Sequence, residues 1–254
     1  MVLGIVGDVA RGMSRPLPQY GNTRMLTRVG DTHKMYDNVC PHQGSLIIDK
    51  MQQEISCQYH GWSWDNNGSP TGHGSTRACN RATLEPMDVF ETNGMLFDAL
   101  IDLSYLNINF NNFFLDGYRT DIVHASALTI MDVFLDVDHI PVVHKDVYEV
   151  IGIEGAADVE WDYFSWGSVQ KVRGKTENEW AAVWIAVNHH TMIEWQPGAL
   201  FITVCLPAAT TNVTPVGVWK YYEKDSPDSL RQLNSDIWER AWYQDKHQAS
   251  QLIR

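Results

Sequence analysis

Two short stretches that place a cysteine close to a histidine constrain this chain more than any other feature. They are "CPHQG" at residues 40–44 and "CQYHGW" at residues 57–62. Together they give Cys40-x-His42, then fourteen residues, then Cys57-x-x-His60. Two thiolates and two imidazoles can hold a zinc ion in a tetrahedral site. They can also hold a [2Fe–2S] cluster, with both cysteines on one iron and both histidines on the other. The spacing predicts two loops that close over one metal site.

The residues around the four candidate ligands favour the cluster over zinc. Gly44 and Gly61 follow the histidines closely, and glycine lets backbone N–H groups approach the cluster sulfides. Four cysteines in 254 residues do not indicate a disulfide scaffold, so metal or redox chemistry is the better interpretation of the paired ones. Cys79 and Cys205 stand apart from the pattern and are expected to be small core residues.

This pair of loops resembles the Rieske family, whose motif is C-x-H, about fifteen residues, then C-x-x-H. The flanking letters "CPHQG" and "YHGW" agree with the family as well as the ligands do. The respiratory-chain branch has a further cysteine in each loop, where this chain has Ser45 and Tyr59. The resemblance therefore implies a Rieske [2Fe–2S] cluster of the oxygenase or ferredoxin branch, bound by the four residues of the two loops (Cys40, His42, Cys57 and His60).

A second group of candidate ligands lies in "MDVFLDVDHIPVVH", residues 131–144. The pattern predicts a helix over residues 127–139, which Pro141 should end near His139 or Ile140. On such a helix Asp132, Asp136 and His139 share one face, and His144 follows the break. Acidic and histidine residues near a helix end are more often surface or capping groups than ligands, so this segment alone leaves both interpretations open.

The last helix adds a carboxylate at an unusual position. Ser226 as N-cap and Pro227 at the first helical position predict a helix that runs to about Leu252. At 100° per residue Asp245 lies within about 60° of a row of mainly apolar side chains, namely Trp238, Ala241, Trp242, Ala249 and Leu252. Asp236 points the opposite way. A carboxylate within an apolar stripe is costly unless a cation or several donors meet it, and an iron ion would do so.

Two histidines and one carboxylate form the facial triad of non-haem Fe(II) oxygen-activating enzymes, which makes His139, His144 and Asp245 candidate iron ligands. The sequence also resembles the catalytic (α) subunits of Rieske non-haem iron oxygenases. These have a D-x-x-H-x(4)-H motif, matched here by Asp136, His139 and His144, and a late aspartate often preceded by Glu or Gln, matched by Gln244-Asp245.

This second resemblance implies a terminal oxygenase component. Electrons from NAD(P)H would arrive through a reductase, a ferredoxin or both, pass to the cluster and then to a mononuclear Fe(II). The iron would use O₂ to hydroxylate or oxidatively demethylate a small organic substrate, aromatic or amine. The family forms homotrimers in which one subunit's cluster serves its neighbour's iron, and Asp136 would bridge a cluster histidine, His60, to His139. The alternative is a non-catalytic electron carrier whose second domain binds a ligand or a partner.

The fold class expected is α+β. A small all-β Rieske domain, residues 1–103, should precede a helix-grip-like catalytic domain, residues 104–254, in which an antiparallel sheet is covered by the C-terminal helix. Short strands are predicted between residues 25 and 97, with an Asn-Gly hairpin turn inside "ETNGMLF", and again over residues 159–222. Strands around residues 184–204 should line the substrate cavity, with Trp184, Asn188 and Trp195 as candidates.

Composition narrows the possible partners. The formal net charge of −12 argues against nucleic acid and anionic lipid. No apolar run approaches the length of a membrane span, and the first residues lack the pattern of a secretory signal. We therefore expect a cytoplasmic protein.

Overall fold

The computed structural model describes residues 1–71, 82–148, 159–173, 180–208 and 212–252. Cys79, which was expected to be a small core residue, lies outside this range. The chain divides into two compact units, one of residues 2–111 and one of residues 112–254 together with Met1. The first unit consists mainly of short strands, and the second combines an antiparallel sheet with helices. The predicted α+β fold class is therefore confirmed. Among the described residues, no helix has the length and apolar character needed to cross a membrane.

The regular structure described in the first unit consists of short strands and 3₁₀ turns. Three antiparallel sheets follow the orders β1-β8-β7, β2-β3-β4 and β5-β6. The strands are β1 (Val2–Ile5), β2 (Ser14–Pro16), β3 (Arg24–Val29), β4 (Thr32–Asp37), β5 (Ile55–Ser56), β6 (Ser63–Trp64), β7 (Phe90–Thr92) and β8 (Met95–Phe97). The 3₁₀ turns are Val6–Asp8, Pro18–Tyr20, Ser104–Leu106 and Phe110–Asn112, the last of which reaches one residue into the second unit.

The Asn-Gly turn predicted between β7 and β8 is present. Asn93 and Gly94 both have positive φ, 51° and 93°, as a two-residue hairpin turn of the primed type requires. The turn brings Thr92 opposite Met95 and Phe90 opposite Phe97. The hairpin prediction is therefore confirmed.

The second unit is built on one seven-stranded antiparallel sheet with the order β10-β11-β12-β13-β14-β15-β9. Its strands are β9 (Phe113–Val123), β10 (Val159–Phe164), β11 (Gly167–Arg173), β12 (Trp180–Val187), β13 (Thr191–Gln196), β14 (Ala199–Cys205) and β15 (Thr214–Glu223). Neighbours in the chain are neighbours in the sheet, except that β9 closes the far edge against β15. The strands expected over residues 159–222 are thus present.

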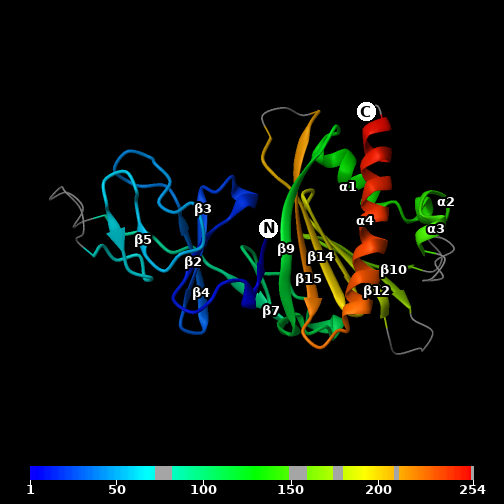
Figure 1. Ribbon diagram of the computed structural model, residues 1–254, viewed down its shortest axis with the longest axis horizontal. Coiled ribbons are helices and arrows are strands. Elements are labelled where there is room, and N and C mark those ends of the chain that lie inside the picture. The colour runs from blue at the N-terminus through cyan, green and yellow to red at the C-terminus, as the bar shows by residue number, and fades with distance from the viewer. Residues whose placement is uncertain (72–81, 149–158, 174–179, 209–211, 253–254) are drawn as a thin grey trace. The chain divides into compact units, whose positions relative to one another are not determined.

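Helices cover one face of this sheet, as Figure 1 shows for the C-terminal helix. They are α1 (Ala127–Leu135), a 3₁₀ turn (Val137–His139), α2 (Ile140–Val143), α3 (Lys145–Tyr148) and α4 (Asp228–Gln251). Two clusters of buried side chains join α1 and α4 to the sheet; they include Met192, Phe201 and Trp184 from strands and Ile237, Trp238 and Trp242 from α4. The predicted antiparallel sheet under a C-terminal helix is confirmed.

Two helix boundaries differ from the sequence prediction. The first helix ends at Leu135, because Asp136 leaves helical geometry (φ −80°, ψ 95°) and its carboxylate caps the following 3₁₀ turn by accepting from Asp138 N–H at 3.1 Å. Pro141 therefore does not end that helix but sits in the first turn of α2, where its missing N–H is not needed. The last helix starts one residue later than predicted, with Pro227 rather than Ser226 as N-cap.

Candidate metal centres

The two cysteine–histidine loops have the same backbone design. In the first loop the N–H of Gly44 donates to the carbonyl of Cys40 at 2.9 Å, and in the second the N–H of Gly61 donates to the carbonyl of Cys57 at 2.8 Å. Both glycines have positive φ, 74° and 71°, a conformation that other residues adopt only at a cost. Each loop therefore turns tightly enough to present its cysteine and its histidine on the same side.

The cysteines and histidines of the two loops meet in pairs. Cys40 and Cys57 are both buried and neither is in a disulfide, and the two thiols lie close enough to influence each other's pKa. The imidazoles of His42 and His60 lie edge to face, with ring centroids 4.7 Å apart. Trp62 stacks on His42 at 4.9 Å between centroids. The thiol pair is enclosed and the imidazole pair lies toward solvent, since His42 is exposed and His60 half-buried.

Donors around the sulfur atoms suit a bound cluster. Burial raises the pKa of the Cys40 thiol. Burial acts on Cys57 as well, but the hydroxyl of Ser45 and backbone N–H groups, that of Tyr59 among them, hold the pKa of Cys57 below its usual value. The Ser45 oxygen lies 3.5 Å from the Cys57 sulfur. Hydrogen bonds of this kind stabilise thiolates that ligate iron. The donor set fits a [2Fe–2S] cluster, and the contact of Ser45 is one that the motif does not reveal.

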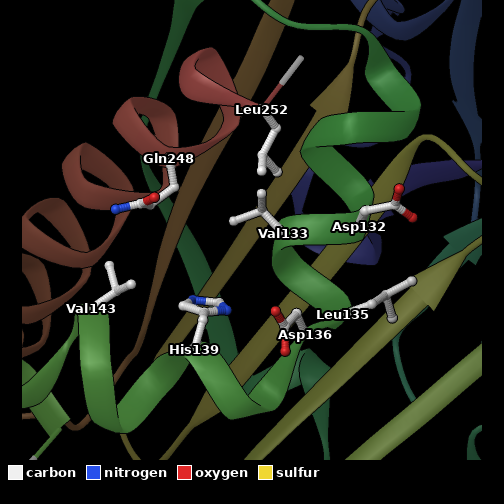
Figure 2. Close-up of a pocket in the computed structure, with 8 residues that line it drawn as sticks. All are labelled: Asp132, Val133, Leu135, Asp136, His139, Val143, Gln248 and Leu252. Atoms are coloured by element: carbon white, nitrogen blue, oxygen red, sulfur yellow. The ribbon is translucent and has the colours of Figure 1, made fainter. Parts of the chain in front are cut away.

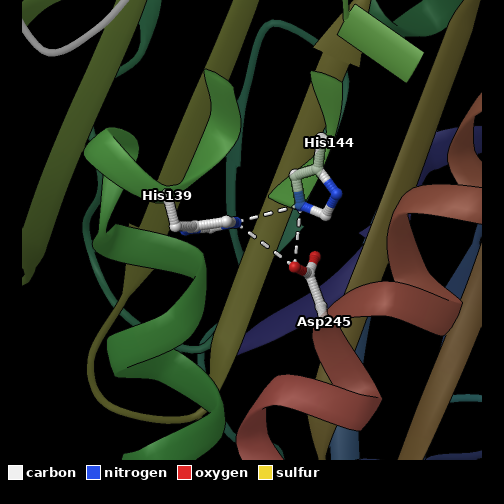
Figure 3. A group of neighbouring side chains, drawn as sticks. All are labelled: His139, His144 and Asp245. Atoms are coloured by element: carbon white, nitrogen blue, oxygen red, sulfur yellow. Dashed lines mark hydrogen bonds and ion pairs between the residues drawn. The ribbon is translucent and has the colours of Figure 1, made fainter. Parts of the chain in front are cut away.

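A second convergence of ligand atoms lies under α4 in the second unit. His139, His144 and Asp245 each contribute one atom to a group whose members all lie within 4.8 Å of one another. The Nε2 atoms of His139 and His144 are 2.9 Å apart, and Asp245 Oδ1 lies 3.3 Å from the first and 2.8 Å from the second (Figure 3). His144 and Asp245 are buried and His139 is half-buried. Three ligand atoms aimed at one point in a buried site fit a metal ion.

Gln244 fixes the orientation of His144. Its Oε1 lies 2.7 Å from His144 Nδ1, so Nδ1 carries the proton and donates it. When a metal ion replaces the proton that Nε2 shares with Asp245 in the metal-free site, the lone pair of Nε2 would bind the ion, the usual arrangement of a ligating histidine. Gln244 was singled out in the sequence only as the residue before Asp245; its contact with His144 required the helix geometry.

Electrostatics reinforce this group. Burial raises the pKa of Asp245, but hydrogen bonds from His139 and His144 outweigh burial and hold it below its usual value. Burial lowers the pKa of His144, but Asp245 and Gln244 outweigh it and raise that pKa. Without a metal ion the histidines and the aspartate neutralise one another. A divalent cation would take over that role, because it attracts the same three ligand atoms.

A cavity of about 500 Å³ opens beside His139. Its lining comes from α1, from the short turns and helix that follow α1, and from the end of α4. Figure 2 shows these residues: Asp132, Val133, Leu135, Asp136, His139, Val143, Gln248 and Leu252. Asp132, Asp136 and His139 thus share this cavity although the helix breaks between the first and the last. Asp136 is exposed, and the Nδ1 atom of His139 is buried without a hydrogen-bond partner among the described residues.

The residues proposed to line the substrate cavity do not share one face of the sheet, and none of them lines the cavity beside His139. Trp184 is buried on the helix-covered face of the sheet, in the cluster with Met192 and Ala241. Trp195 pairs with Val183 and Leu200, one residue out of step with that face. Asn188 is exposed in the turn after β12, with a φ of 53°. Cys205 is buried, as expected for a core residue.

Comparison with known proteins bears on the first site directly. Residues 1–83 match the family described as the Rieske [2Fe–2S] domain. The N-terminal part of this chain is a Rieske domain. The [2Fe–2S] cluster follows from that membership, and the Cys40–Cys57 and His42–His60 pairs of the Rieske domain are the candidate ligands.

A curated protein is similar to part of this chain. The chain is 30% identical over 102 residues to the terminal oxygenase component CarAa of carbazole 1,9a-dioxygenase from a Sphingomonas species. The match covers 37% of this chain and 27% of the relative, so the chain spans about a quarter of the relative's length in that alignment.

Solved structures extend the likeness beyond the Rieske domain. The quaternary ammonium Rieske monooxygenase CntA superposes with a TM-score of 0.77 at 14% identity, over 98% of this chain and 76% of CntA. Naphthalene 1,2-dioxygenase superposes with a TM-score of 0.73 at 15% identity, over 99% of this chain and 74% of that structure. NdmA of Pseudomonas putida CBB5 gives 0.53 at 16% identity, over 94% and 75%. The chain has the fold of Rieske oxygenase catalytic subunits.

Proposed function

We propose that this protein is the terminal oxygenase component of a Rieske-type system, with a Rieske domain at residues 1–103 and a catalytic domain at residues 104–254. Cys40, His42, Cys57 and His60 would hold the cluster. His139, His144 and Asp245 would hold a mononuclear ferrous ion. The observation that carries the proposal is the convergence of two imidazoles and one carboxylate in a chain that also contains a Rieske domain. When bound, the cluster supplies single electrons and the ferrous ion activates O₂ beside the substrate.

The protein's own residues prepare the iron site. Gln244 holds His144 in the tautomer that leaves Nε2 free, through the 2.7 Å contact to Nδ1. Asp245 is placed inward by the apolar face of α4, between the buried Trp242 and Ala249. His139, His144 and Asp245 would be the only protein ligands offered by the described residues of this group, and three such ligands would leave room for O₂ beside the substrate.

Asp136 is the candidate link to the electron donor. It lines the same cavity as His139, whose Nδ1 lacks a partner among the described residues. A carboxylate that accepts from this N–H would fix the His139 tautomer as Gln244 fixes that of His144. Because Asp136 is exposed, it could also accept from a cluster histidine, His60, of a second copy of this chain. A homotrimer supplied by a reductase or a ferredoxin would provide that arrangement.

The alternative is an electron carrier with a ligand-binding second domain. It gives no reason for His139, His144 and Asp245 to lie together. A carrier needs only the cysteine–histidine loops. His144 and Asp245 would then be two polar groups buried in the second unit at a cost in stability, with the half-buried Gln244 orienting one of them to no purpose. The geometry therefore supports the oxygenase over the carrier.

The experiment is a single turnover with isotopically labelled oxygen. Protein loaded with iron and sulfide is reduced chemically without a reductase and exposed to ¹⁸O₂ with a panel of small aromatic and amine substrates. We expect ¹⁸O in a hydroxylated product, or formaldehyde together with the demethylated product when a methyl group is removed, in amounts that follow the number of reduced iron centres. Reoxidation that yields neither a labelled product nor formaldehyde from any member of the panel would contradict the proposal and favour the carrier.

A further inference from the structure

Strand β9 forms one edge of the seven-stranded sheet, beside β15 (Figure 1). It pairs with β15 on one side only. On its other side, the backbone of residues 117–123 forms no hydrogen bond with any described part of the chain. An edge strand of this kind presents a row of N–H and C=O groups with which a further strand can pair.

The segment lacks the usual protection against such pairing. Edge strands are commonly protected by lysine, proline or a bulge, and residues 117–123 contain neither lysine nor proline. The bulge of β9 lies earlier, where Asp116 is the extra residue between the pairs that Leu115 and Gly117 form with β15. Residues 117–123 are therefore a regular strand that is open to pairing.

The face of this segment that is turned away from α4 is partly apolar. Side chains alternate between the two faces of a strand. Tyr118, Thr120 and Ile122 point away from α4 and are exposed, with exposed fractions of 43% for Tyr118 and 58% for Ile122. Burial of the two large side chains against other apolar side chains would be favourable.

The face turned toward α4 carries two opposite charges in fixed positions. Arg119 Nη2 lies 2.9 Å from Glu239 Oε2, and Lys246 Nζ lies 3.4 Å from Asp121 Oδ2. Arg119 and Asp121 also contact each other, with Nε 3.2 Å from Oδ2. Their side chains remain 34% and 19% exposed, so each can still meet a charge from beyond the edge of the sheet.

One antiparallel register of two β9 strands satisfies both faces. When Thr120 lies opposite the same residue of a second copy, Tyr118 lies opposite the second copy's Ile122, and Arg119 lies opposite the second copy's Asp121. Directly opposed side chains share a face, where apolar pairs and opposite charges both stabilise the pairing. A shift of two residues in either direction places Arg119 opposite Arg119 or Asp121 opposite Asp121, which like charges disfavour. A shift of one residue brings the apolar face of one copy onto the charged face of the other.

We propose that residues 117–123 of β9 pair with the same residues of a second copy of this chain, antiparallel and centred on Thr120, so that the two sheets join edge to edge. A two-fold interface of this kind is self-complementary. A single strand pair is a small interface, but in the homotrimer proposed above three such contacts would join two trimers and reinforce one another. The inference concerns assembly and uses no metal ligand, so it goes beyond the proposed function.

The first test is a cross-link at the two-fold position. Thr120→Cys places its thiol opposite the same thiol of the second copy, within reach of a disulfide. Protein loaded with cluster and iron is treated with diamide and run on a denaturing gel without reductant. We expect most chains to migrate as a dimer that a thiol reductant separates. Thr32→Cys, at an exposed threonine of β4, is the matched control and should stay monomeric on the gel, as should the unaltered protein. Thr120→Cys chains that stay monomeric, or Thr32→Cys chains that dimerise equally, would overturn the inference.

The second test is the number of chains per particle, measured by sedimentation. The unaltered protein should contain an even number of chains. Thr120→Lys places two like charges opposite each other and should halve that number, while Thr32→Lys should leave it unchanged. An odd number of chains in the unaltered protein, or a number that Thr120→Lys does not lower, would overturn the inference. Iron content and the ¹⁸O₂ experiment are read separately, so a failure of this assembly leaves the proposed function standing.

Discussion

At the scale of single residues, the candidate sites depend on polar atoms held in fixed directions. The Nε2 atoms of His139 and His144 meet Asp245 because Gln244 engages the far side of His144. The matching position on the far side of His139 has no partner among the described residues, and Asp136 lines the cavity there. The ligand sets could be read from motif spacing, because ligand types and spacing follow from the metal's chemistry. The contacts of Gln244 with His144 and of Ser45 with Cys57 could not, because each joins residues of different segments of the chain.

The bridging role of Asp136 gives the residue-scale prediction. Asp136→Asn should keep full iron and sulfide content, because Asp136 is outside both ligand sets, yet lower O₂-coupled turnover by about tenfold or more, as loss of a carboxylate behind a ligating histidine does. The measurement is product formed per electron delivered. Asp138→Asn, at the exposed neighbour, is the matched control. Near-normal coupled turnover in Asp136→Asn would count against the bridge.

At the scale of elements, α4 joins the metal group to the sheet. The strand pattern and the last helix were predictable from periodicity. The end of α1 at Leu135 could not be predicted in this way, because it depends on Asp136 leaving the helix to cap the next turn. The pairing of β9 with β15 was equally hidden, since it joins residues about a hundred positions apart and no local pattern encodes such a contact.

The turn between β13 and β14 supports the start of α4. Gly198 has a φ of 86°, and a Cβ there would lie 2.9 Å from Ser226 Oγ and 3.0 Å from a methyl of Leu230. Gly198→Ala should therefore lower the free energy of unfolding by roughly 1–3 kcal/mol, measured as a lower thermal midpoint. Gly117→Ala, where a Cβ meets nothing within 4 Å, should change it far less. Equal midpoints for the two variants would show that the turn does not support the helix in this way.

Asp121 on β9 contacts Trp242 and Lys246 on α4, and Arg119 on its own strand. These contacts join β9 to α4 and make the free energy of unfolding depend on pH. Burial would raise the pKa of Asp121, but the Trp242 indole, Arg119 and Lys246 outweigh burial and lower it below its usual value of 3.8. A depressed carboxyl pKa stabilises the fold at pH values above 3.8, and this contribution is lost as the pH falls through the folded-state pKa. Asp121→Asn should cost roughly 1–2 kcal/mol at pH 7 and less at pH 3, by thermal unfolding of metal-free protein. A difference that stays constant from pH 7 to pH 3 would show that the charge of Asp121 is not responsible.

At the scale of the whole molecule, the proposal requires electrons to pass between copies of the chain. A Cys57→Ser subunit should lack the cluster, and an Asp245→Ala subunit should lack the mononuclear iron. Neither should turn over alone. Mixed oligomers, formed by co-expression with two affinity tags, should recover a fraction of the activity, because an intact cluster on one subunit can face an intact iron site on the next. Mixed oligomers as inactive as the two parents would show that each chain works by itself or not at all.

The central claim is that each chain holds iron in two places. The direct measurement is iron and acid-labile sulfide per chain in anaerobically reconstituted protein, together with the electron paramagnetic resonance spectrum after addition of nitric oxide. The account predicts about three irons and two sulfides, a Rieske signal on reduction and a ferrous–nitrosyl signal. In Asp245→Ala it predicts about two irons, the same Rieske signal and no nitrosyl signal. Two irons in the unaltered protein with no nitrosyl signal, or a full third iron in Asp245→Ala, would contradict the account.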